Sequence, residues 1–106
     1  MIDEISCQEL NKKIEDKDTF ILLDVREDDE YETCHLENSH LIPLDTLSEK
    51  MNTLDKNKEI IVYCKMGGRS AQACLFLKEN GFEDVKNLAG GIRQWALEID
   101  TSVALY

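Results

Sequence analysis

Two apolar stretches of strand length dominate the hydropathy pattern of the chain. They cover residues 19–24 ("TFILLD") and 59–64 ("EIIVYC"), and both stay apolar at successive positions instead of alternating with polar residues. Strands that are apolar on both faces are typical of parallel sheets covered by helices. A further short strand is predicted over residues 84–88 ("DVKNL").

Helical patterns lie between and around these strands. Ser6 and Glu9 have the spacing of a capping box, and Leu10 and Ile14 then recur on one helical face. This pattern predicts a helix near the start of the chain.

A second capping-box spacing, Thr46 and Glu49, lies between the first two strands. It predicts a helix that presents Leu47, Met51 and Leu54 on one face.

Two more helices are expected in the second half of the chain. One begins near Ser70 and ends at Gly81, a residue type favoured just after a helix. The other follows the Gly90-Gly91 pair and carries Trp95 and Ile99. Strands alternating with helices predict a three-layer α/β fold, in which helices flank a central, mainly parallel sheet, and residues 1–106 are expected to form a single domain.

Composition narrows the classes of function. The formal net charge of −10 disfavours binding to nucleic acid or to an anionic membrane surface. The acidic residues could also serve only to keep the protein soluble. The four cysteines form no CxxC pair and there are two histidines, so we expect no metal and no cofactor. With no signal-like start, the sequence indicates free thiols in a reducing cytoplasm. With no surplus amphipathic helix, we expect a monomer.

The most informative stretch is residues 63–77, "YCKMGGRSAQACLFL". Cys64 ends a predicted buried strand, where α/β proteins place their ligand sites. Gly67 and Gly68 allow successive backbone N–H groups to point inward, and the following helix adds its own unpaired N–H groups. Lys65 and Arg69 supply positive charge, and no acidic residue occurs between Cys64 and Lys78. The arrangement favours a thiolate nucleophile, although a buried structural cysteine before a glycine turn is the alternative.

The length of this loop bears on the chemistry. Four residues, 65–68, separate Cys64 from Arg69. Cysteine phosphatases share such a cradle but have a loop one residue longer, which encircles a phosphate. The smaller arc suits one additional sulfur atom on the cysteine and therefore indicates a persulfide.

Four motifs in order resemble those of the rhodanese family of sulfurtransferases. They are "DVRE" (24–27), "HL" with "IP" (35–36 and 42–43), "CKMGGR" (64–69) and "LAGGIRQW" (88–95). The ending from Gly90 onward is similar to the rhodanese domain fused to adenylyltransferases that activate ubiquitin-like sulfur carriers. The resemblance implies a rhodanese-like fold over essentially the whole chain.

The resemblance implies specific roles in the loop. Cys64 would accept sulfur from thiosulfate or a persulfide donor and pass it to a thiol, cyanide or a sulfur-carrier protein. The amides of residues 65–70, which include Met66, Gly67, Gly68 and Ser70, would stabilise the terminal sulfur. Lys65 would help to bind an anionic donor. Arg69 has two alternatives, contact with the donor or a brace from the loop to an acid.

Other residues of the matching motifs are interpreted as structural. Asp24 and Arg26 are expected to form an ion pair that holds loops together, with substrate contact as the alternative. His35 is interpreted as structural, His40 as a half-buried strand residue and Trp95 as part of the core.

The chain departs from the family pattern in "CHLENSHLIP", residues 34–43, where Cys34 replaces a glycine. Cys34 is interpreted as a small buried thiol, with attack on a Cys64 persulfide as the alternative, and Asn38 can still form the turn. Cys74 is expected in the core, whereas Cys7 is expected to be exposed.

Two other functions are kept as alternatives to the sulfurtransferase. One is a docking module of the rhodanese type with little activity, and retention of Cys64, both loop glycines and Arg69 argues against it. The other is a cysteine phosphatase or arsenate reductase, which the loop length disfavours.

Overall fold

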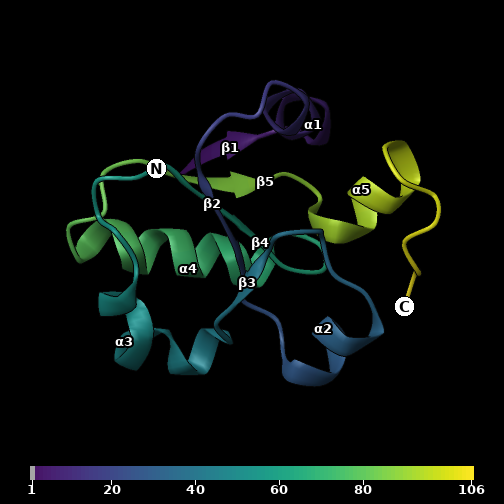
Figure 1. The fold of residues 1–106 in the computed structure, drawn as a ribbon. Coiled ribbons are helices and arrows are strands. Elements are labelled where there is room, and N and C mark those ends of the chain that lie inside the picture. Colours follow the sequence, from purple (N-terminus) through teal and green to yellow (C-terminus); the bar gives the residue numbers. More distant parts are fainter. Residues whose placement is uncertain (1) are drawn as a thin grey trace.

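Five strands in one sheet form the centre of the computed structural model, which describes residues 2–106 (Figure 1). Every strand pair in this part of the chain is parallel, and the spatial order is β1-β5-β4-β2-β3. The strands are β1 (Asp3–Ile5), β2 (Ile21–Asp24), β3 (His40–Leu41), β4 (Ile60–Tyr63) and β5 (Val85–Leu88). β4 occupies the middle position, so the end of β4 lies at the centre of the sheet edge.

Helices cover both faces of the sheet. The α-helices are α1 (Cys7–Glu15), α2 (Asp28–Thr33), α3 (Leu47–Lys50), α4 (Gly68–Glu79) and α5 (Gly91–Glu98). One core cluster joins the sheet to α3 and α4, and a second joins its other face to α1 and α5 (Figure 1). Successive residues of β4 alternate between the two clusters, because side chains of a strand point to opposite faces. The predicted three-layer α/β architecture is confirmed.

Sequence patterns located several elements well. The Ser6–Glu9 capping box is present at the start of α1, with the Ser6 hydroxyl accepting from Glu9 N at 3.0 Å. α4 begins at Gly68, two residues before the position expected, and Gly81 follows its end with φ +91°. Asn38 adopts φ +65°, as expected for the altered turn.

The predicted capping box at Thr46 was wrong. The Thr46 hydroxyl donates backward to the carbonyl of Pro43 at 2.9 Å and therefore does not cap the helix. α3 is only Leu47–Lys50, and 3₁₀ turns over Leu44–Thr46 and Met51–Thr53 flank it. The hydrophobic spacing was real, however, because Leu47 and Leu54 are buried in the core and Met51 packs against it.

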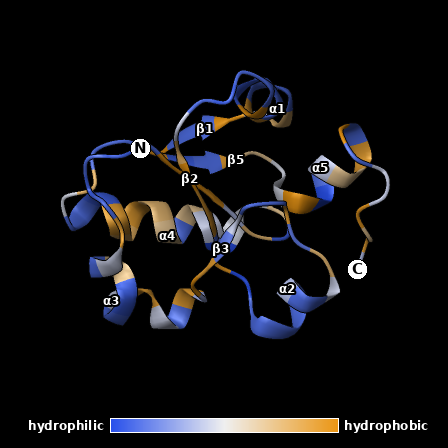
Figure 2. Ribbon diagram, viewed as in Figure 1, coloured by the Kyte–Doolittle hydropathy of each residue, from blue (hydrophilic) through white to orange (hydrophobic). Residues whose placement is uncertain are grey.

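Two elements had no sequence prediction. β1 is a three-residue edge strand paired with β5. α2 contains no buried residue and is hydrophilic along its length (Figure 2). Polar contacts are therefore important in holding α2 in place.

Three residues differ in exposure from expectation, and one of them, Cys34, is half-buried where a buried thiol was expected. Cys7 is 2% exposed, because the first residue of α1 packs beneath α5 in the second cluster. His40 lies in a strand, as predicted, but is exposed because β3 is at the edge of the sheet. Cys74 and Trp95 are buried as expected. No helix among residues 2–106 is long and apolar enough to cross a bilayer.

Candidate active site

Cys64 directly follows the central strand β4, and its side chain is 1% exposed. Three groups surround its sulfur: Gly67 N at 3.1 Å, Ser70 N at 3.4 Å and Ser70 Oγ at 3.3 Å. Gly67 adopts φ +111°, which turns the chain back toward the sulfur before α4 begins. The loop therefore forms the predicted cradle of N–H groups at a helix start, with the sulfur at its centre.

The hydrogen bonds to Cys64 outweigh the effect of burial on its thiol. Burial alone opposes ionisation, but the hydroxyl and amide of Ser70 and the amides of Gly67 and Met66 lower the pKa of the thiol below its ordinary value. Cys7 and Cys74 are also buried, and burial raises their pKa values to about 11 and about 12. The cradle, and not burial, thus distinguishes Cys64 chemically from these two thiols.

Ser70 is itself held by Asn87 of β5. The Ser70 hydroxyl donates to the amide oxygen of Asn87 at 2.5 Å. The amide nitrogen of Asn87 donates to the Gly67 carbonyl at 3.2 Å and to Glu4 Oε2 at 3.1 Å. Because both of those partners are acceptors, the amide oxygen has to face Ser70. Asn87 is 2% exposed, so this orientation is fixed inside the protein.

The start of α5 supports the loop from behind. Ile92 N donates to the Cys64 carbonyl at 2.9 Å, and Arg93 N donates to the Lys65 carbonyl at 3.0 Å. A Cβ added to Gly91 would lie only 2.4 Å from the Lys65 carbonyl oxygen, so glycine permits this approach. The outer side of the loop is open. Met66 points outward and is 63% exposed, and a Cβ added to Gly68 would have no neighbouring atom within 4 Å.

Arg69 forms a bidentate ion pair with Glu30 of α2. Nη1 and Nη2 donate to the two carboxylate oxygens at 2.6 and 2.9 Å. Hydrogen bonds from Arg69 lower the pKa of Glu30 to about 2, and the pair raises the pKa of Arg69. Of the two alternatives for Arg69, the structure contains the brace to an acid, and the side chain remains 37% exposed.

Asp24 and Arg26 form a fully buried ion pair. Nε and Nη2 of Arg26 donate to the carboxylate of Asp24, with Nη2 at 2.6 Å from Oδ2, and both side chains are 0% exposed. Nη2 also donates to the Cys34 carbonyl at 2.7 Å. This is the structural ion pair that the sequence indicated. It ties β2 to the segment after α2 and does not contact Cys64.

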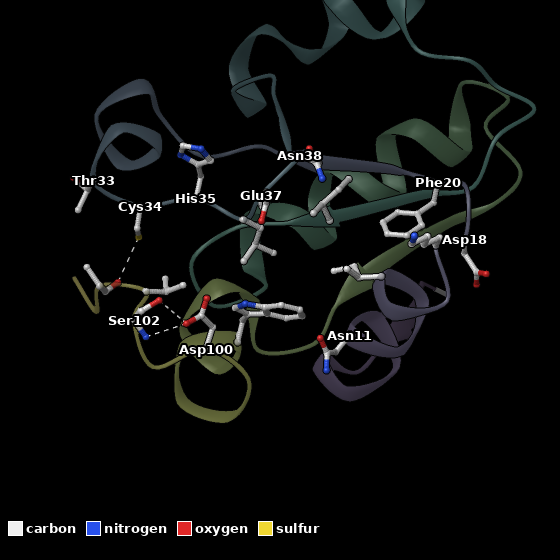
Figure 3. Close-up of a pocket in the computed structure, with 17 residues that line it drawn as sticks. Asn11, Asp18, Phe20, Thr33, Cys34, His35, Glu37, Asn38, Asp100 and Ser102 are labelled. Atoms are coloured by element: carbon white, nitrogen blue, oxygen red, sulfur yellow. Dashed lines mark hydrogen bonds between the residues drawn. The ribbon is translucent and has the colours of Figure 1, made fainter.

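A cavity of about 700 Å³ lies apart from the cradle, and none of residues 64–70 lines it (Figure 3). Its walls come from α1, the connection between α2 and β3, and the segment after α5. Cys34 and Trp95 both line it. Cys34 is half-buried, and its thiol donates to the Ala104 carbonyl at 3.4 Å, so the structure directs it toward this wall and not toward the cradle.

The ring of His35 stacks on the ring of Tyr31 with 3.9 Å between the ring centroids, and Nδ1 of His35 is 2.8 Å from the Tyr31 carbonyl oxygen. Both contacts are local and structural. Among residues 2–106, no group of three or more histidine, cysteine or acidic side chains is arranged to hold a metal ion.

Three residues of the site had no sequence prediction. Glu30 lies in the acidic run 27–30, which does not reveal which carboxylate meets Arg69. Tyr106, whose hydroxyl donates to Glu30 at 2.9 Å, is separated from the loop in the sequence by most of α4, by β5 and by α5. Asn87 offered a signal, since it is a polar residue within a predicted buried strand.

Comparison with known proteins agrees with this geometry. The model of the rhodanese-like domain family matches residues 6–98. A sulfurtransferase from Allochromatium vinosum is 31% identical over 96 residues, spanning 91% of this chain and 90% of that protein. A rhodanese-related protein from Thermoplasma volcanium superimposes with a TM-score of 0.85 and 34% identity, over 98% of this chain and 99% of that one.

Longer proteins contain a similar segment. The adenylyltransferase and sulfurtransferase MOCS3-2 of Zea mays is 31% identical over 109 residues, which span 96% of this chain but 23% of the maize protein. The chain also spans 51% of YrkF, a Bacillus subtilis relative that is 37% identical over 94 residues. The predicted similarity to the rhodanese domains of adenylyltransferases is confirmed.

Proposed function

The chain belongs to the rhodanese-like domain family, and we propose that it is a sulfurtransferase that carries sulfane sulfur as a persulfide on Cys64. The observation that supports this most strongly is the set of hydrogen-bonding groups around the Cys64 sulfur. Gly67 N, Ser70 N and Ser70 Oγ converge on it and lower the pKa of its thiol despite burial. Neighbouring buried thiols have raised pKa values, so this environment is specific to the nucleophile.

The loading step uses thiosulfate or a persulfide as donor. The Cys64 thiolate attacks the outer sulfur of thiosulfate and a new S–S bond forms. The S–S bond of thiosulfate breaks, and sulfite leaves with the electron pair. The loop amides then stabilise the negative terminal sulfur of the persulfide, as in an oxyanion hole. Lys65 and the exposed part of Arg69 attract the anionic donor.

The unloading step regenerates the thiolate. A nucleophile such as a thiolate or cyanide attacks the terminal sulfur, takes it as a neutral atom and leaves the electron pair of the broken bond on Cys64. The name of the maize relative joins adenylyltransferase with sulfurtransferase, and a sulfur-carrier protein is therefore a reasonable acceptor. Four free thiols, including an active one, suit a reducing cytoplasm.

Burial of Cys64 helps to separate this function from phosphatase chemistry. Because Cys64 is only 1% exposed, its sulfur favours a donor with a protruding, small reacting atom, such as the outer sulfur of thiosulfate. A phosphate ester brings a bulkier centre to the nucleophile. A docking module would need no polarised thiol, so the donors around Cys64 favour catalysis over that alternative.

The test is sulfur loading followed by mass spectrometry. Reduced protein is incubated with thiosulfate or with a low-molecular-weight persulfide, and the intact and peptide masses are measured. We expect one added sulfur on the Cys64 peptide of the wild type and none in Cys64→Ser. Failure to load from either donor would contradict the proposal and leave the docking module. Hydrolysis of an aryl phosphate that depends on Cys64 would instead support the phosphatase.

A further inference from the structure

The segment after α5, residues 99–106, folds back toward the active-site loop (Figure 1). Val103 N donates to the Asp100 carbonyl at 3.1 Å, and Val103 packs against the second core cluster. The thiol of Cys34 donates to the carbonyl of Ala104, which attaches the segment to the end of α2. These contacts bring Tyr106 to the region between α2 and the Cys64 loop.

The hydroxyl of Tyr106 joins two charged residues. It accepts a hydrogen bond from Nη1 of the buried Arg26 at 2.7 Å and donates to Oε2 of Glu30 at 2.9 Å. Burial is the main reason that the pKa of Tyr106 rises to about 12, so the hydroxyl keeps its proton at neutral pH. The donated bond is therefore available throughout the physiological range.

Glu30 is the acid that holds Arg69, and each of its two carboxylate oxygens accepts two hydrogen bonds. Its Oε1 accepts from Arg69 Nη1 and from Glu27 N, and its Oε2 accepts from Arg69 Nη2 and from Tyr106. The bonds from Glu27 and Tyr106 fix the plane of the carboxylate independently of Arg69. A bidentate pair depends on that plane, so these bonds also fix the guanidinium of Arg69.

α2 has little else to position it. The helix has six residues and none of them is buried. Polar contacts to Arg26 supplement the pair with Arg69: Nη2 of Arg26 donates to the Cys34 carbonyl, and Nη1 approaches the Glu30 carbonyl at 3.4 Å. The Tyr31 hydroxyl of α2 also donates to the Ser39 carbonyl at 3.0 Å. Because no residue of α2 is fully buried, the location of Glu30 depends largely on such hydrogen bonds, and the bond from Tyr106 reaches its carboxylate directly.

The ring of Tyr106 reaches the loop at a second point. Nζ of Lys65 lies 4.6 Å from the ring centroid, within cation–π distance. The hydroxyl thus acts on Arg69 through Glu30, and the ring contacts Lys65, the residue after Cys64. The same side chain meets both cationic residues of the loop.

We propose that Tyr106 is a positioning residue for the Cys64 loop, which fixes Arg69 through Glu30 and holds Lys65 against its ring. Its effect on sulfur transfer rests on the function proposed above, whereas its effect on the Cys64 thiol does not. The charged groups around that thiol are Lys65 and Arg69 of its own loop, Glu30 behind Arg69, and Glu4 of β1 behind Asn87. Loosening Arg69 frees the start of α4 and weakens the donation from Gly67 N and Ser70 N to the sulfur.

Tyr106→Phe tests the hydroxyl and keeps the ring over Lys65. Thr53→Val is the control, since the Thr53 hydroxyl is exposed and donates to the Lys50 carbonyl at 2.7 Å, away from α2 and the Cys64 loop. The rate of Cys64 alkylation by iodoacetamide is followed against pH by peptide mass spectrometry, and sulfur loading from thiosulfate is measured in parallel. Peptide resolution separates Cys64 from the other three thiols.

We expect Tyr106→Phe to move the alkylation profile to higher pH and to lower kcat/KM for thiosulfate roughly 3- to 30-fold. This is less than the roughly 10- to 150-fold that one hydrogen bond to a charged group is worth, because Tyr106 acts on the loop indirectly through Glu30. Thr53→Val should change neither. An unchanged profile in Tyr106→Phe, or an equal shift in Thr53→Val, would overturn the positioning role. If the wild type takes up no sulfur but Tyr106→Phe still moves the profile, the positioning role stands and the sulfurtransferase proposal fails.

Discussion

The hydroxyl oxygen of Ser70 lies 3.3 Å from the sulfur of Cys64, and in this geometry its proton points to Asn87. A hydroxyl has one proton, so Ser70 here accepts from the neutral thiol. When the thiol ionises, the same hydroxyl can turn its proton to the sulfur. Ser70 therefore accommodates both states of the nucleophile without movement of the backbone.

Removal of this hydroxyl should raise the pKa of the Cys64 thiol. In Ser70→Ala the amides of Gly67 and Ser70 remain, but the donor for the thiolate is lost. A hydrogen bond to a charged group contributes about 1.5–3 kcal/mol, so sulfur loading at neutral pH should fall about tenfold or more. The alkylation rate of Cys64 against pH measures the pKa directly. Ser102→Ala, which removes an exposed hydroxyl bonded to Asp100, is the control and should behave as wild type.

The two glycines that begin α4 and α5 should respond very differently to a methyl group. At Gly91, φ is +63° and an added Cβ would lie 2.4 Å from the Lys65 carbonyl oxygen and 2.5 Å from that of Cys64. Both atoms are backbone and cannot move without displacing the loop. Gly91→Ala should therefore destabilise the protein by about 3 kcal/mol or more.

Gly68 is the matched comparison, because its Cβ would meet nothing within 4 Å. Gly68→Ala should leave the free energy of unfolding within about 1 kcal/mol of wild type, since alanine is the better helix former. Urea denaturation of both variants measures the difference. Equal destabilisation by the two substitutions would show that the close approach of α5 does not hold the loop.

The central strands and the loop could be predicted from the sequence because their signals are local. An apolar run of strand length ends in Cys64, and the glycines follow at once, so the chain order itself places nucleophile, turn and helix together. The buried pair of Asp24 and Arg26 was predictable for the same reason, since only Val25 separates the two residues at the end of β2.

The partners of the loop could not be predicted in this way. Glu30, Asn87 and Tyr106 reach it from α2, β5 and the segment after α5, and their spacing in sequence contains no information about these contacts. α2 lacks an apolar face, and β1 gains its strand conformation only by pairing with β5. Such elements depend on the folded neighbours that complete them, which a local pattern does not describe. The predicted exposure of Cys7 was wrong for the same reason, because the distant helix α5 covers this residue in the folded protein.

The Asp24–Arg26 pair should be sensitive to the loss of one partner. Both side chains are 0% exposed, and Asp24 accepts three of the six hydrogen bonds that the Arg26 side chain donates. Removing one charge of a buried pair typically costs about 3–5 kcal/mol, because the other charge stays buried without compensation. Asp24→Asn should lower the free energy of unfolding by about this amount in urea denaturation.

An exposed carboxylate provides the control for that change. Asp84 pairs with Lys86 at 2.7 Å, but its side chain is 55% exposed. Asp84→Asn should cost about 1 kcal/mol or less. If Asp24→Asn were as mild as Asp84→Asn, the buried pair would not be the structural connection between β2 and the end of α2 that its hydrogen bonds indicate.

The Glu30–Arg69 pair should make stability depend on pH in the acid range. The pKa of Glu30 is lowered from 4.5 to about 2, chiefly by hydrogen bonds from Arg69. A carboxylate with a depressed pKa stabilises the folded state above its unfolded pKa, and this contribution disappears as pH falls through the folded value. Wild type should therefore lose stability relative to Glu30→Gln between about pH 4.5 and about pH 2.

The difference between wild type and Glu30→Gln should reach about 1–3 kcal/mol near pH 6, because Arg69 is 37% exposed and water screens the pair in part. Free energies of unfolding from urea titrations at several pH values give this curve. Glu32→Gln removes the same formal charge from an exposed position of α2 and should run parallel to wild type. A difference between wild type and Glu30→Gln that stays constant down to pH 2 would mean that Glu30 acts through its shape and not through its charge. Arg69 would then have no electrostatic anchor on α2, and Asn87, α5 and the Tyr106 ring would hold the loop.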